Sequence, residues 1–140
     1  MIDPFLPENS DIYNVKYLGL DNEEVPGQVC HHFHVKAVNE DETLINGDYY
    51  FESNSFNMIK VDFSPAKLVK KTMFKMKNLN MSILLSPTPE GYWLPSRFDI
   101  EGKGKAMFFI GVNFSGTEYY RNPVINGGID DSVFEVDNGK

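Results

Sequence analysis

The sequence predicts an all-β fold, an antiparallel meander with little or no helix. Aromatic residues make up 14% of the 140 residues, a share that favours strands over helices. Apolar and polar residues alternate at period two along most of the chain, as they do in half-buried strands. Turn residues, rather than helix caps, separate these stretches. We therefore expect roughly seven or eight strands in a single domain that covers residues 1–140.

Four strands are expected before residue 64. They cover residues 12–20, 28–39, 47–52 and 56–63. The turns between them are rich in Asp, Asn, Glu, Gly and Pro, and the first contains Pro26 and Gly27. In the second strand Phe33 and Val35 share one face, whereas His32 and His34 share the other.

The alternation changes phase between residues 71 and 85. Phe74 and Met76 belong to one apolar set, and Leu79 and Met81 begin the next set one position out of step. A period-two pattern cannot skip a residue without a bulge or a turn, so we predict one within 77–80. A last strand is expected at 117–121, followed by a turn-rich tail from Ile125.

The stretch 91–114 predicts a hairpin whose two strands flank a tight turn at Gly102 and Gly104. Its two strands together place a broad apolar wall on one side. The members of this wall are Tyr92, Leu94, Phe98, Ile100, Phe108, Ile110 and Phe114. We expect Trp93, Arg97 and Asp99 to face the other way.

Charge argues against nucleic acid as a partner. The net charge of −7 repels phosphate backbones unless a local basic patch compensates. The candidate patch comprises Lys67, Lys70, Lys71, Lys75 and Lys77, and we interpret it as solvated lysines that discourage edge pairing rather than as a site for an anionic partner. Nowhere do about 18 consecutive apolar residues occur, so we expect no transmembrane segment. The N-terminal residues have neither the basic nor the long apolar region of an export signal.

One stretch contains candidate metal ligands. In a strand, Cys30, His32 and His34 would point the same way about 6 to 7 Å apart, and alternate residues of one strand can share a zinc ion. Against this, no second cluster supplies obvious further ligands, so a metal-binding domain is our third interpretation. The sequence carries no nucleophile elbow, glycine-rich phosphate loop or His-Glu-x-x-His motif, and we predict neither an enzyme nor a cofactor.

The order of residues resembles a known family. A Tyr-rich first strand from Tyr13, the stretch Gly91-Tyr92-Trp93-Leu94-Pro95-Ser96-Arg97 and the closing segment 129–134 carry the likeness. The chain is similar, from about residue 13 to 134, to outer-membrane lipoprotein-sorting proteins of the LolA-like superfamily.

That resemblance implies a curved open sheet, an unclosed barrel whose apolar face accepts the acyl chains of a lipid or lipoprotein. It makes the apolar wall of 91–114 the candidate ligand-binding face, and a packing face of the core is the alternative. It implies a non-enzymatic carrier or binding module of the bacterial cell envelope, in the periplasm. The chain matches the later strands of the family, so the resemblance also implies half of such a barrel, lacking N-terminal strands and helices. A complete single domain and a fragment of a longer protein both remain open.

A half barrel leaves an apolar face and a strand edge to be covered. Two solutions are open: a homodimer, or a core closed by the segments 5–12 and 125–136 folding back across the sheet. A second interpretation of function follows from the exposed edge. The chain would then be a protein-interaction domain that pairs its edge strand with a partner and has no ligand cavity.

Overall fold

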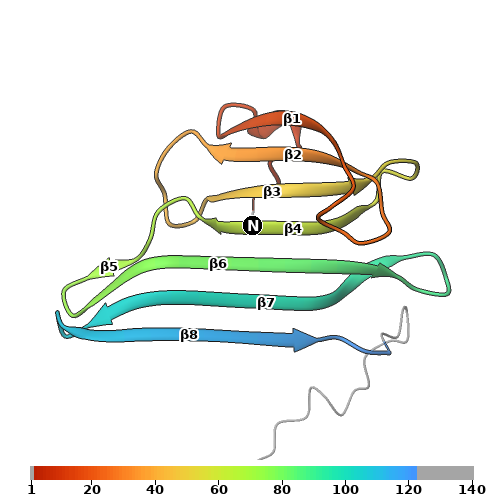
Figure 1. Cartoon of the computed structure of the whole chain (residues 1–140). Helices are drawn as coiled ribbons and strands as arrows, with labels where there is room; N and C mark the ends of the chain where they lie inside the picture. Colours follow the sequence, from red (N-terminus) through yellow and green to blue (C-terminus); the bar gives the residue numbers. More distant parts are fainter. Residues whose placement is uncertain (1, 123–140) are drawn as a thin grey trace, which may run out of the picture.

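The computed structural model describes residues 2–122, which form one open antiparallel sheet (Figure 1). A 3-10 turn, η1 (Pro7–Asn9), precedes the strands. The strands are β1 (Tyr13–Asp21), β2 (Cys30–Ala37), β3 (Ile45–Glu52), β4 (Met58–Pro65), β5 (Lys70–Lys71), β6 (Phe74–Pro87), β7 (Trp93–Ala106) and β8 (Ile110–Tyr119). They lie in the order β1-β2-β3-β4-β6-β7-β8, with β5 beside β6. The predicted all-β, open meander is confirmed.

Bulges divide the sheet into segments with different phases of alternation. The predicted irregularity of the sixth strand is confirmed, because the β6–β7 register shifts between Met76 and Asn78. The extra residue, Lys77, restores both apolar sets to the same face. The β6–β7 register shifts a second time between Leu84 and Leu85, so Ser96 of β7 has no Cα partner in β6. This irregularity accommodates the proline at position 95 within the strand.

The main core lies on one face of β1–β4, which we call the apolar face. Its buried members are Tyr13, Val35, Ala37, Leu44, Ile45, Tyr49, Val61 and Phe63. Burial, with smaller contributions from Tyr13 and Asp3, raises the pKa of the Tyr49 hydroxyl to about 12. The N-terminal segment closes this core, since the Phe5 ring meets Phe33, Tyr49 and Phe51 edge to face. Residues 5–12 thus cover part of the core, as one of the two expected solutions requires, whereas the tail 125–136 lies outside the described residues and the homodimer stays a prediction.

A smaller cluster lies on the opposite face, which we call the polar face. Val25, in the loop between β1 and β2, packs there with Cys30, Tyr50 and Ile59, and Trp93 lies against them. The Glu24 carboxylate of the same loop accepts a hydrogen bond from Lys60 Nζ at 3.0 Å. The loop thereby covers one end of β2–β4.

The predicted turn at Gly102 and Gly104 is wrong. Strand β7 runs through both glycines to Ala106, and the chain turns at residues 107–109 instead. These glycines serve close packing: a Cβ on Gly102 would lie 2.4 Å from the Phe114 ring, and one on Gly104 would lie 2.9 Å from the Lys75 carbonyl oxygen. The separate last strand predicted at 117–121 is also wrong, because β8 is continuous from Ile110 to Tyr119.

The two halves of the sheet differ in length and burial. Strands β6 and β7 have 14 residues each, against eight or nine in β1–β4, and with β8 they project beyond the first four strands as a ribbon (Figure 1). Among the described residues, the fully buried hydrophobic side chains all fall between Tyr13 and Phe63. None of the helices described is long and apolar enough to cross a membrane.

Candidate functional site

The apolar face continues over β6, β7 and β8 and is half-exposed there. Register places Phe98 and Ile100 of β7 opposite Ile83 and Met81 of β6. In the β7–β8 pair, even-numbered residues of β7 lie opposite even-numbered residues of β8. Phe114 of β8 therefore belongs to the same face as Phe98 and Ile100. The alternation predicted for the centre of the hairpin is therefore observed, and Arg97 and Asp99 lie on the polar face.

At the outer edge of the apolar face an aromatic ring lies over a glycine. The Phe114 ring occupies the position that a Cβ of Gly102 would take. An aromatic ring that covers a cross-strand glycine replaces the side chain that the glycine lacks. Nearby is a hollow of about 410 Å³, lined by Ile83, Leu94, Pro95, Phe98 and Tyr120. Its lining is predominantly apolar, which suits a hydrocarbon chain.

Not all predicted ligand-facing residues join this face. Phe98, Ile100, Phe114 and Ile110 share it, and Leu94 lines the hollow beside Phe98. Tyr92 precedes β7 in the β6–β7 turn. Phe108 lies in the β7–β8 turn at the far end of the ribbon and is 75% exposed, so its predicted place on a strand is wrong. The physical reason is the longer β7, which carries the chain past the glycines before it reverses.

The polar face carries a row of polar side chains that crosses the whole sheet. In strand order, Cα partners place Lys16, His34, Asp48, Asp62, Ser82, Asp99 and Thr117 side by side. Six of these residues, all but Lys16, line a broad hollow of about 750 Å³. This hollow lies on the polar face, opposite to the face with the predicted ligand-binding residues.

The carboxylates of this row already have partners. Asp62 pairs with Lys60 at 2.9 Å, and Arg97 pairs with Asp99 at 2.8 Å. The Thr117 hydroxyl donates to Asp99 at 2.6 Å, and this bond, with a smaller contribution from Arg97, lowers the pKa of Asp99. The two ion pairs join residues of one strand, whereas the Thr117–Asp99 hydrogen bond joins β8 to β7 and stabilises the pairing of these strands.

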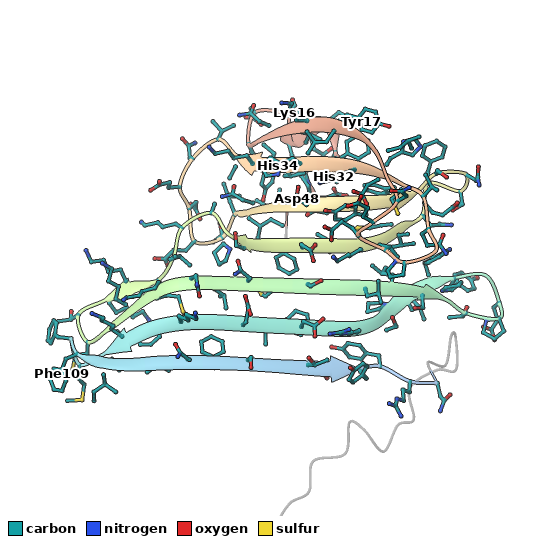
Figure 2. All side chains as sticks on the ribbon, viewed as in Figure 1. Lys16, Tyr17, His32, His34, Asp48 and Phe109 are labelled. Atoms are coloured by element: carbon teal, nitrogen blue, oxygen red, sulfur yellow. The ribbon has the colours of Figure 1, made fainter. Side chains whose placement is uncertain are left out.

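Cys30 and the two histidines do not converge on a common point. The Cys30 side chain is buried among Val25, Tyr50 and Ile59, and burial raises its pKa, as Asp21 and Glu52 do more weakly. His32 Nε2 and His34 Nδ1 instead lie 2.7 and 3.0 Å from the same oxygen of Asp48 (Figure 2).

In residues 2–122 no group of three or more His, Cys, Asp or Glu side chains is placed to hold a metal ion. The structure therefore gives no support to a metal site at Cys30, His32 and His34. The thiol that the strand pattern placed beside the two histidines is used for packing instead.

Comparison with models of known families, with curated proteins and with solved structures gave no match to the chain. The resemblance to LolA-like proteins therefore stays a prediction, and the case for function depends on the geometry of the two faces.

Sequence reasoning missed two features of the surface. The first is the pairing of Asp48 with both histidines, which depends on the β2–β3 register and has no local signal. The second is the end of the ribbon, where Met107, Phe108 and Phe109 are exposed beside lysines. The absence of acidic residues from the segment 102–117 could have marked this end in the sequence.

Proposed function

We propose that the chain is a non-enzymatic binding module of the bacterial cell envelope that takes the acyl chains of a lipid or lipoprotein on its apolar face over β6–β8. The observation that carries the proposal is the uneven burial of this face. Over β2–β4 it is covered by Phe5 and its neighbours, whereas on β6–β8 no hydrophobic side chain of the described residues is buried. A contiguous apolar surface of this kind marks a binding surface.

The shape and composition of the face suit a flexible hydrocarbon. Ile83, Phe98, Ile100 and Phe114 offer branched and aromatic surface, and Glu118 of the edge strand is the charged neighbour of Phe98 on this face. Met81 adds a thioether that adapts to irregular ligands. Each methylene group that leaves water on such a face contributes about 0.8 kcal/mol, so a long acyl chain binds without any polar anchor.

Lipid extraction and native mass spectrometry of the purified full chain test the proposal. The wild type should retain acyl-chain species, and Phe114→Ser should lose most of them because the ring on the ligand face is gone. Phe56→Ser is the matched control, since Phe56 is also an exposed aromatic residue but lies in the turn between β3 and β4. Wild-type protein that carries no lipid and takes up none from added vesicles would contradict the proposal.

A second candidate function is favoured by the edges of the sheet. The order of strands ends at β1 and β8, and β8 pairs only with β7 among the described strands. A ten-residue edge can add a strand from a partner protein or from a second copy of this chain. Light scattering distinguishes a homodimer from a monomer. An adaptor of this kind would bind its partner with no acyl chain present.

A further inference from the structure

The free end of the ribbon combines exposed apolar side chains with lysines. We call this end the ribbon tip; it is formed by β5, the adjoining residues of β6 and β7, and the β7–β8 turn. The two turns of the tip touch, because Met107 N–H donates to the Met73 carbonyl at 2.8 Å. Phe108 and Phe109 are 75% and 80% exposed, and Phe109 extends beyond the strands at the end of the sheet (Figure 2).

Charge at the tip is opposite to that of the whole protein. The segments 63–89 and 102–117 contain no Asp or Glu, although the chain carries a net charge of −7. They do contain seven lysines, Lys67, Lys70, Lys71, Lys75, Lys77, Lys103 and Lys105. Six of these lysines, all but Lys67, lie on the ribbon, which thus brings together nearly half of the 13 basic residues of an acidic protein.

Three of these lysines face one another directly across the strands. Lys70 of β5 is the Cα partner of Lys75 in β6, and Lys75 is the partner of Lys105 in β7. Like charges directly opposite in a sheet destabilise it. None of the ion pairs within residues 2–122 involves these three lysines. An anionic surface that neutralised them would remove this repulsion.

The β7–β8 turn contains large apolar residues at positions where the backbone φ angle is positive. Met107 and Phe108 have φ values of +48° and +68°, a region that hairpin turns usually fill with Asn and Gly. Large apolar residues at these positions are unfavourable twice, because a positive φ strains the backbone and the side chains expose apolar surface to water. The turn leaves the Met107 side chain 50% and the Phe108 side chain 75% exposed.

We propose that the ribbon tip docks on an anionic lipid membrane, with Phe108 and Phe109 entering the interface and the lysines meeting the phosphate headgroups. A shallow hollow of about 450 Å³ between the turns, lined by lysines together with Met73, Phe74 and Phe108, lies where a headgroup would meet the tip. Amphipathic surfaces of this kind bind by apolar insertion together with attraction to anionic lipids. The membrane site is separate from the apolar face, so it does not depend on that face holding a lipid.

Vesicle co-sedimentation of the full chain tests the site. Wild type should partition onto phosphatidylcholine vesicles that contain phosphatidylglycerol, and not onto pure phosphatidylcholine, and the binding should fall as salt is added. Each lysine near such a surface accounts for about five-fold in affinity, so Lys70→Gln, Lys75→Gln and Lys105→Gln together should weaken binding about a hundred-fold. The double variant Phe108→Ser and Phe109→Ser should weaken it about ten-fold or more.

Controls on the other half of the sheet should bind as wild type does. Phe56→Ser removes an exposed aromatic residue at a different turn, and Lys16→Gln removes a lysine of edge strand β1. The Phe109→Trp variant reports insertion directly: its added tryptophan fluorescence should shift to the blue on anionic vesicles, whereas Phe56→Trp should not respond.

Three results would overturn the proposal. The first is no partitioning of the wild type, and the second is unchanged partitioning of the tip variants. The third is binding that the lysine variant loses and the phenylalanine variant keeps, because that pattern indicates a polyanion such as nucleic acid or an acidic protein. The tip variants should still retain acyl chains in lipid extraction, which shows that the membrane site is separate from the apolar face. If the apolar face binds no lipid, the vesicle result still stands.

Discussion

Replacing Phe5 by alanine tests whether the N-terminal segment closes the core of β1–β4. The ring is 37% exposed, and its centroid lies 5.7, 5.1 and 5.2 Å from those of Phe33, Tyr49 and Phe51. About 100 Å² of apolar surface is thereby removed from water, which at about 25 cal/mol per Å² contributes about 2.5 kcal/mol. Edge-to-face ring contacts add about 0.5 kcal/mol or more. We expect Phe5→Ala to lower the free energy of unfolding by about 3 kcal/mol.

Urea unfolding followed by near- and far-ultraviolet circular dichroism measures this change. Phe5→Leu keeps most of the burial and loses the ring contacts, so it should cost less than half as much. Phe109→Ala removes a ring that is 80% exposed and should stay within about 0.5 kcal/mol of the wild type. A Phe5→Ala protein as stable as Phe109→Ala would refute the closure of the core by the N-terminal segment.

Two further predictions concern the sheet itself. A Cβ on Gly47 would lie 2.6 Å from the backbone oxygen of Asp62, so Gly47→Ala should push β3 and β4 apart and lower the free energy of unfolding by about 1–3 kcal/mol. Gly111→Ala is the control, because a Cβ on Gly111 meets open space and should leave the stability unchanged. Equal losses of stability in the two variants would contradict the close packing at Gly47. The Thr117 hydrogen bond lowers the pKa of Asp99 below its ordinary 3.8. The bond to the ionised carboxylate therefore stabilises the fold fully above pH 3.8, and this stabilisation is lost as the pH falls through the folded-state pKa of Asp99. The stability gap between wild type and Thr117→Val, measured by urea unfolding at a series of pH values, should therefore narrow in acid, and a gap that does not change with pH would contradict this role.

Local patterns were enough to predict the class of fold and most strand positions. Period-two alternation located all eight ends of β1–β4 to within two residues, and the phase change after Met76 predicted the bulge that the register shows. These features depend on neighbours in the sequence. The same alternation correctly placed Phe98 and Ile100 on one face, because a strand alternates whatever its partners are.

Features that depend on partner strands could not be predicted. Gly102 and Gly104 have the composition of a turn, and only the rings and backbone of neighbouring strands explain why they lie inside β7. The same error put Phe108 on a strand instead of in the exposed turn. Cys30 fits a metal-binding pattern on its own strand, yet the β1–β2 loop folds over it and makes it a core residue.

The dependence of affinity on acyl chain length is the most direct test of the apolar face over β6–β8. In calorimetric titrations of the full chain with fatty acids of increasing length, each added methylene should tighten binding about four-fold until the face is covered. Ile100→Asp places a charge at the centre of this face and should abolish both the binding and its dependence on length. Binding that does not change with chain length, or that Ile100→Asp leaves intact, would contradict the account.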